Sequence, residues 1–158
     1  MKKIFSIFPI LLFAVLVFNC SEEKSNYVAV SKFDPNRNAE ADIQDAVAEA
    51  ERTDKRIILD VGGEWCIWCH RIDQFIDENK ELKDFLNEHY LVVKINYSKE
   101  NKNEELLSNY PEIEGYPHFF VLESDGTLLH SQNTGDLEKE KSYDIDKFMT
   151  FLKEWMRG

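Results

Sequence analysis

The feature that most constrains the fold is an alternation of apolar strand patterns with apolar helix patterns between residues 38 and 156. Three short runs rich in β-branched and aromatic residues predict buried strands. They cover residues 56–61, 90–96 and 119–122, and a turn signal at 124–126 predicts a further strand over 127–131. Apolar residues at spacings of three and four predict helices. These helices are expected over 38–53, 68–79, 81–89, 103–109 and 144–156.

This order predicts one α/β domain, over residues 38–158, with a mixed central sheet and helices on both faces. Asn38 is expected to cap the first helix. Hydrophobic residues make up 43% of the chain, enough for a substantial core. The net charge of −11 argues against binding to nucleic acid or to anionic lipid by charge.

Residues 1–19 have the pattern of a signal peptide. Lys2 and Lys3 provide the positive start, and the apolar run over 4–18 is short for a membrane span. The sequence therefore predicts export of the protein to the periplasmic side of the membrane.

Cys20 ends this run and resembles the lipidated cysteine of bacterial lipoproteins. The residues Val17 and Asn19 differ from the usual lipoprotein pattern, which has Leu and a small residue in those places. We expect residues 20–37 to form a lipidated tether to the cell membrane or the outer membrane. An uncleaved anchor, or a secretory signal in which Cys20 has no role, is the alternative.

The two other cysteines, Cys66 and Cys69, lie between a predicted strand and a predicted helix. At the start of a helix, free amides and the macrodipole stabilise a thiolate, and a thiolate is the nucleophile in disulfide exchange. Cys69 follows about one helical turn later, where it can attack a mixed disulfide formed at Cys66. The pair is therefore predicted to be redox-active.

Three alternatives compete for this pair. A second Cys or His pair at zinc spacing is missing from the sequence, so no metal site is expected. The run from Cys66 to His70 also fits the Cys-x-x-Cys-His motif of c-type haem attachment. Its place directly after a buried strand favours redox chemistry, and a visible spectrum would reveal a haem. The third alternative is a fixed structural disulfide.

The segment from Leu59 to Cys69 resembles the active site of the thioredoxin superfamily. It is most similar to thioredoxin-like, thiol:disulfide interchange lipoproteins with a Trp-Cys-x-Trp-Cys motif. The resemblance extends over residues 38–156. It implies a three-layer sandwich, exchange of disulfides with protein substrates, and no bound cofactor.

The same resemblance implies roles for residues outside the cysteine pair. Asp60 matches the family's buried acid, which moves the proton of the resolving cysteine, and Lys94 matches a lysine near that acid. Tyr116-Pro117 matches the cis-proline that binds substrate backbone. Alternatively, Asp60 and Lys94 are ordinary solvent-facing residues.

Trp65 and Trp68 are expected to form an apolar rim where substrates dock, with packing as the alternative. Ile67 and Trp68 separate the two cysteines, and this pair matches neither the reducing nor the oxidising pattern. The overall likeness to reducing relatives favours a reductase, reset by a membrane redox partner. A non-catalytic binding module that keeps the thioredoxin-like fold is the other hypothesis.

Overall fold

Four strands form one mixed sheet in the computed structural model, which describes residue 25 and residues 27–158. The order across the sheet is β2 (Tyr90–Asn96), β1 (Arg56–Gly62), β3 (His118–Leu122) and β4 (Leu128–Asn133). β1 runs parallel to β2 and antiparallel to β3, and β3 runs antiparallel to β4. β1 is almost continuously apolar because it is central and buried on both faces.

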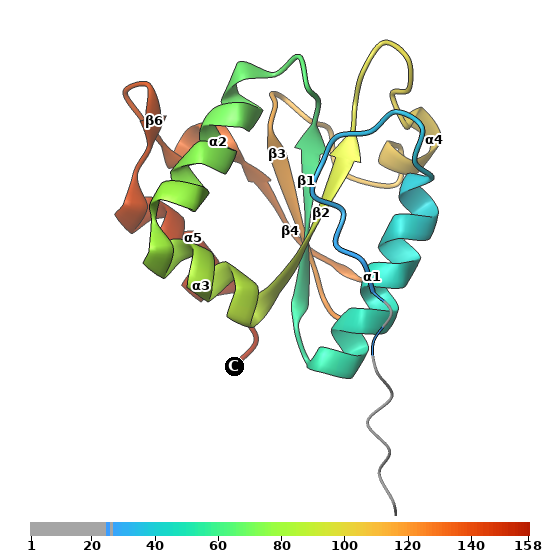
Figure 1. Ribbon diagram of the computed structural model, residues 1–158, viewed down its shortest axis with the longest axis horizontal. Helices are drawn as coiled ribbons and strands as arrows, with labels where there is room; N and C mark the ends of the chain where they lie inside the picture. The colour runs from blue at the N-terminus through green and yellow to red at the C-terminus, as the bar shows by residue number, and fades with distance from the viewer. Residues whose placement is uncertain (1–24, 26) are drawn as a thin grey trace, which may run out of the picture.

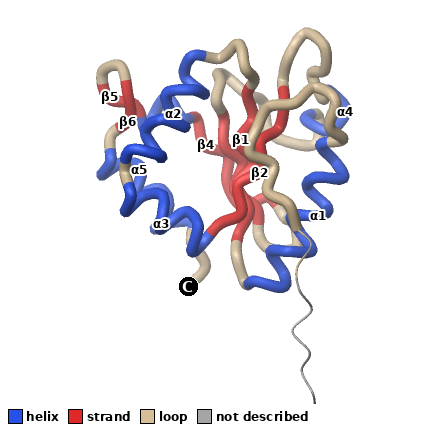
Figure 2. The backbone as a smooth tube through the Cα atoms, viewed as in Figure 1, coloured by secondary structure: helices blue, strands red, loops and turns tan. Residues whose placement is uncertain are grey.

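Helices cover both faces of this sheet (Figures 1 and 2). One face carries α1 (Ala39–Thr53) and α4 (Glu104–Leu107); the other carries α2 (Ile67–Glu78), α3 (Lys80–His89) and α5 (Ile145–Trp155). The predicted α/β three-layer sandwich is therefore confirmed. None of the described helices is long and apolar enough to cross a membrane.

The alternation of side chains along β1 divides the core in two. Ile57, Leu59 and Val61 join the cluster beneath α1, whereas Ile58 joins the cluster formed with α2, α3 and α5. Asp60 shares the face of Ile58 and therefore lies beneath α2. This register places an acidic side chain within an otherwise apolar strand, next to the end of the strand where the cysteines follow.

The predicted elements lie close to the observed ones, and the Asn38 side chain caps α1 by accepting a hydrogen bond from the Ala41 amide. Between β4 and α5, however, the structure adds elements that were not predicted. They are a short 3₁₀-helix, Thr134–Leu137, and a small hairpin of β5 (Glu138–Lys139) and β6 (Ser142–Tyr143). Strands of two residues are too short to leave an apolar pattern in the sequence.

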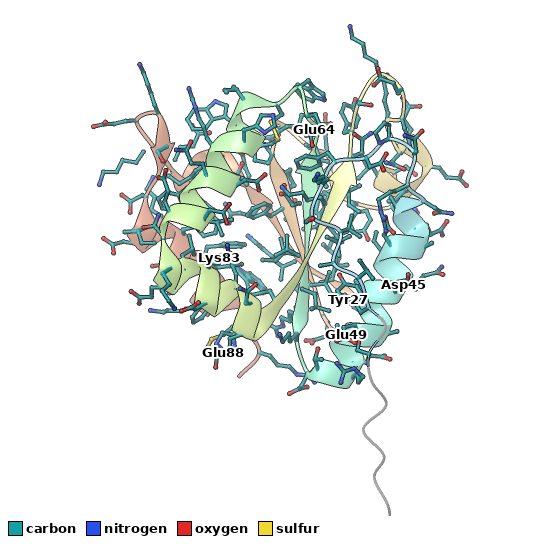
Figure 3. All side chains as sticks on the ribbon, in the orientation of Figure 1. Tyr27, Asp45, Glu49, Glu64, Lys83 and Glu88 are labelled. Atoms are coloured by element: carbon teal, nitrogen blue, oxygen red, sulfur yellow. A yellow bond between two sulfur atoms is a disulfide. The ribbon has the colours of Figure 1, made fainter. Side chains whose placement is uncertain are left out.

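The described part of the segment expected to form a tether makes contacts with the domain. Residues 27–33, here called the strap, pack on the domain, with Val30 5% and Phe33 4% exposed. The Val30 carbonyl accepts a hydrogen bond from the Lys94 amide (3.1 Å), so the strap covers the open edge of β2. Figure 1 shows it in blue beside the β2 edge, and Tyr27 lies beside α1 in Figure 3. The predicted signal peptide and Cys20 lie outside the described residues.

Candidate active site

Cys66 and Cys69 form a disulfide at the start of α2, with their Cα atoms 5.2 Å apart. Cys66 is the N-cap residue, and its Sγ accepts a hydrogen bond from the Cys69 amide (3.1 Å). Cys69 is fully buried, whereas Cys66 keeps 4% of its surface exposed. Of the two cysteines, only Cys66 retains any exposed surface.

Gly62, at the end of β1, makes room for this disulfide. A Cβ at this position would lie 2.5 Å from the Cys69 Sγ and 3.1 Å from the ring of Phe33. Any larger residue would displace the sulfur or the ring, because real Cβ contacts are not that short. The turn from β1 to α2 is held by a hydrogen bond from the Cys66 amide to the Gly63 carbonyl (2.9 Å). Figure 3 labels Glu64 in this turn, beside the yellow sulfur atoms.

A chain of charged groups runs from the core behind the disulfide toward solvent. Lys94 lies opposite Asp60 in the β1–β2 register, and its Nζ donates to Asp60 Oδ2 at 2.9 Å. The same Nζ donates to Asp73 Oδ1 of α2 at 2.7 Å. Asp60 is 2% exposed, and the Lys94 side chain 9%, whereas that of Asp73 is 41% exposed. Neither Asp60 nor Lys94 is the solvent-facing residue that the alternative interpretation required.

Burial gives Asp60 unusual acid-base properties. Desolvation raises the pKa of Asp60, although the neighbouring Lys94 ammonium opposes that rise. Burial by itself would lower the pKa of Lys94, but Asp60 and Asp73 outweigh it and raise that pKa. Asp60 Oδ1 is buried and has no hydrogen-bond partner among the described residues. Asp60 therefore offers an oxygen that can take up a proton next to the redox pair.

An aromatic surface borders the disulfide on the side of β2 and β3. Trp65 is 58% exposed, and its Nε1 donates to the Tyr97 carbonyl at 2.6 Å. Its ring meets Tyr116 edge to face (5.6 Å), and Tyr116 stacks on Tyr97 (4.7 Å). The Tyr116–Pro117 peptide bond is cis, as the resemblance implies, and Tyr116 packs against the cluster of both cysteines. The structure thus brings Trp65 and Tyr116 to one surface, with the buried Pro117 following Tyr116 in the chain.

Trp68 differs from Trp65, because it is half-buried and packs into the core beneath α2. Its ring meets Tyr143 of the unpredicted hairpin edge to face (5.8 Å), and the Arg71 guanidinium lies 4.4 Å from the ring centroid. The packing interpretation therefore accounts for most of its contacts. Of the two residues between the cysteines, Ile67 is the exposed one, at 60%.

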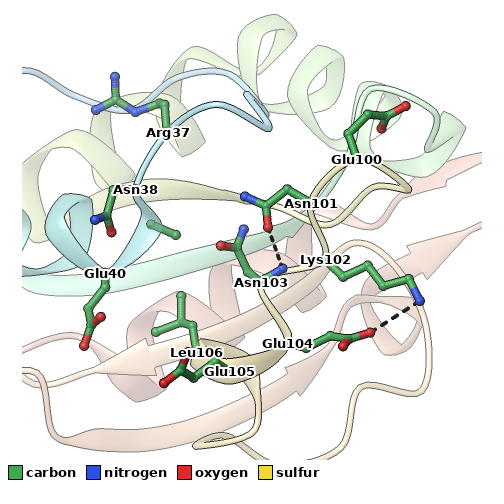
Figure 4. Close-up of a pocket in the computed structure, with 11 residues that line it drawn as sticks. Arg37, Asn38, Glu40, Glu100, Asn101, Lys102, Asn103, Glu104, Glu105 and Leu106 are labelled. Carbon is green, nitrogen blue, oxygen red and sulfur yellow. Dashed lines mark hydrogen bonds and ion pairs between the residues drawn. The ribbon is translucent and has the colours of Figure 1, made fainter.

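His70 and the surface hollows lie outside this centre. The His70 ring contacts the Glu64 carbonyl through Nε2 (2.8 Å). Within the part of the chain that the structure describes, no group of His, Cys, Asp or Glu is arranged to hold a metal ion. A hollow of about 600 Å³ lies between the start of α1 and residues 100–106 (Figure 4). Its lining includes the ion pair of Lys102 with Glu104 and contains neither cysteine.

Sequence reasoning missed four residues of this centre, namely Phe33, Asp73, Tyr97 and Tyr143. Asp73 lies four residues after Cys69, on the same face of α2, so helical spacing could have located it. Phe33 and Tyr143 reach the site from segments with no regular pattern. Their contribution depends on contacts between distant parts of the chain, which periodicity does not reveal.

Comparison with known proteins agrees with this geometry. Residues 38–124 match the sequence family described as thioredoxin-like. The disulfide bond reductase DsbH of Chlamydia pneumoniae is 28% identical over 76 residues, which are 43% of this chain and 45% of that protein. The match thus spans less than half of that relative's length.

Two solved structures are similar over most of the chain. A disulphide isomerase from Xylella fastidiosa Temecula1 superposes with a TM-score of 0.67 at 25% identity, over 81% of this chain and 98% of that chain. The C-terminal domain of DsbD from Neisseria meningitidis, in its reduced form, has a TM-score of 0.52 at 25% identity, over 73% and 96% of the two chains. In both comparisons almost the whole solved chain is matched.

Proposed function

Because the chain belongs to the thioredoxin-like family through residues 38–124, we propose that it is an exported thiol-disulfide oxidoreductase that reduces disulfides in protein substrates. The observation that carries the proposal is the Cys66–Cys69 disulfide at the start of α2, whose Cys69 sulfur lies against Gly62, two residues along β1 from the buried Asp60. A helix N-terminus favours the thiolate at Cys66, and burial protects Cys69 from solvent thiols.

The proposed reaction starts from the dithiol form. The Cys66 thiolate attacks one sulfur of a substrate disulfide, forms a mixed disulfide with it, and releases the other substrate sulfur as a thiolate. The substrate segment docks on the aromatic surface of Trp65 and Tyr116, beside Pro117. Since Trp65 is largely exposed, it can contact a partner without rearrangement of the core.

Cys69 then completes the exchange. Its thiol gives its proton to Asp60, and the resulting thiolate attacks the Cys66 sulfur, breaking the mixed disulfide. The second substrate sulfur leaves as a thiolate, so two electrons have passed to the substrate and the Cys66–Cys69 disulfide remains. Lys94 stabilises the ionised form of Asp60, which lets the acid release the proton again.

The N-terminal sequence supports the proposed cell compartment. Lys2, Lys3 and the apolar run over 4–18 support export, and Cys20 supports a lipid anchor on the periplasmic side. A membrane redox partner would restore the dithiol form. The similarity to a disulfide bond reductase supports the reducing direction. Loss of labelled-palmitate incorporation in a Cys20→Ser variant would test the anchor.

Insulin reduction by the full chain, with dithiothreitol as electron donor, tests the activity. We expect the wild-type protein to accelerate precipitation of the insulin B chain and Cys66→Ser to lack this activity. Equal inactivity of both, with a disulfide that resists reduction by glutathione, would favour the non-catalytic binding module. The reduction potential of the pair tests direction, because a value near −270 mV is typical of thioredoxin and one near −120 mV of a strong oxidant.

A further inference from the structure

Phe33 connects the strap to the redox centre. It belongs to a small buried cluster whose other members are Cys66 and Cys69, with Trp68 and Tyr116 packed around it. Its ring centroid also lies 4.3 Å from the Lys94 Nζ. A single aromatic side chain therefore contacts both the disulfide and the cation that pairs with Asp60.

The position of Phe33 follows from the geometry of β1. Asp60 and Gly62 are two residues apart, so both face α2. Because Gly62 has no side chain, the Phe33 ring and the Cys69 sulfur occupy the space where that side chain would lie, next along this face from Asp60. The strap brings the ring there and is itself held by the hydrogen bond between the Lys94 amide and the Val30 carbonyl.

Two physical effects follow from this contact. The π face of an aromatic ring attracts a cation, most strongly where water is excluded, so the ring stabilises the Lys94 ammonium at its observed place. The ring also fills volume that water would otherwise occupy, which keeps Asp60 and Cys69 desolvated. Neither effect requires Phe33 to touch a substrate.

We propose that Phe33 is a positioning residue of the redox centre, which holds Lys94 against Asp60 and excludes water from the space between Asp60 and Cys69. The strap is then part of the catalytic domain rather than part of a tether. This inference rests on the proposed disulfide exchange at Cys66 and Cys69 and adds a residue that maintains the proton acceptor for it.

Other ionisable groups around Asp60 must be considered in a test. Lys94 of β2 and Asp73 of α2 act on its pKa, and the Tyr143 phenol of the hairpin is coupled to it by charge. The two cysteines do not titrate in the disulfide form. A titration of the oxidised protein therefore reports on Asp60 without interference from the thiols.

The test is the pKa of Asp60, measured by carboxyl carbon NMR in the oxidised full chain. In Phe33→Ala, water gains access to the carboxyl and lowers the pKa of Asp60, while a looser Lys94 would raise it. Desolvation is the larger of the two influences on this carboxyl, so we expect the pKa of Asp60 to fall, by about one unit. The pH midpoint of disulfide exchange should shift in the same direction. Val30→Ala is the matched control, because Val30 is equally buried in the strap but packs in the cluster beneath α1.

Two results would overturn the inference: a folded Phe33→Ala protein with an unchanged Asp60 pKa, or an equal shift in Val30→Ala. Should Phe33→Ala not fold, Phe33→Leu keeps an apolar side chain and should show a smaller shift in the same direction, and no shift in it also counts against the inference. Because the titration needs no substrate, a failed insulin assay with a normal titration response would reject the proposed function while leaving the role of Phe33 in place.

Discussion

The acid-base properties of the redox centre depend on a single buried carboxyl. Asp60 is paired with Lys94 through one oxygen only, and desolvation dominates its pKa. A charged carboxyl that is buried with only one of its oxygens paired lowers the stability of the fold. A mutation of Asp60 can therefore impair the function of the protein and still stabilise its fold.

Asp60→Asn should stabilise the protein and slow its chemistry. A carboxyl whose pKa is higher in the folded state holds its proton more tightly there, so ionising it destabilises the fold. That loss is complete above the folded pKa and absent below the unfolded value of 3.8. We expect the free energy of unfolding in urea at pH 7 to rise by on the order of 1 kcal/mol, with the gain vanishing near pH 3.

The reaction of the same Asp60→Asn variant should be slower at the resolution step, because Cys69 loses its proton acceptor. Asp73→Asn, at the exposed end of the same network, should give no stability gain. A variant of Asp60 that is destabilised at pH 7 and equally destabilised at pH 3 would contradict the assignment of a raised pKa.

His118 gives the stability of the protein a pH dependence opposite in sign to that of Asp60. It follows Pro117, is buried, and donates to or accepts from Ser131 Oγ through Nε2 (2.8 Å), while its Nδ1 has no partner among the described residues. Burial lowers the pKa of His118 to about 4. The unfolded chain binds a proton near pH 6.5 that the folded protein does not, so stability falls as the pH drops from 7 toward 4.

We expect His118 to account for a loss on the order of 2 kcal/mol in the free energy of unfolding between pH 7 and pH 4.5. His118→Phe removes the titrating group, so this part of the pH dependence should disappear from urea unfolding curves. His89→Phe serves as the control, since that histidine is half-buried in the last turn of α3, outside the sheet that holds His118. Identical pH profiles for wild type and His118→Phe would refute the prediction.

At the scale of elements, a mutation at the start of α1 shows whether the stability of the fold and the chemistry of the cysteine pair are independent. Its N-cap is the Asn38 side chain, and the helix lies on the face of the sheet opposite α2. Asn38→Ala should lower the free energy of unfolding by about 1 kcal/mol without changing the reduction potential of the cysteine pair. Asn38→Ser keeps a capping oxygen and should recover most of the stability, and a changed potential in either variant would mean that α1 influences the site.

The elements that the sequence analysis found share one property: their apolar pattern is local. The continuous apolar run of β1 and the spacing of three and four in α1 and α5 needed no knowledge of distant contacts. The strap and the hairpin of β5 and β6 lack such patterns. Phe33 stands among polar residues and Val30 ends an apolar run of four residues that is too short to predict an element. Both become buried where the strap lies along the open edge of β2.

The same distinction applies to the site. Cys66 and Cys69 could be identified from their motif, whereas Asp60 and Lys94 were identified through the family resemblance. The β1–β2 register places Asp60 and Lys94 opposite each other. Their proposed roles depend on this arrangement and on the family resemblance. Phe33 and Tyr143 reach the centre through tertiary packing alone, and the exposure that separates Trp65 from Trp68 also depends on the hairpin, which the sequence did not predict.

For the whole molecule, the folded unit begins before residue 38. A chain that starts at residue 38 loses the burial of Val30 and Phe33, each contributing about 1.5–3 kcal/mol, and exposes the hydrogen-bonding edge of β2. Compared with a chain that starts at residue 25, we expect it to unfold at lower urea, by about 4 kcal/mol in free energy, and to aggregate more readily.

The comparison also separates the strap from the residues before it. Both truncated chains lack the predicted signal and Cys20, so their difference reports only on residues 25–37. A chain that starts at residue 25 with Val30→Ala and Phe33→Ala together should lose most of the same stability while keeping the backbone bond to Lys94. If the chain starting at residue 38 proved as stable as the longer one, the strap would be only a tether. The packing of Phe33 on Lys94 would then contribute nothing to the free energy of unfolding.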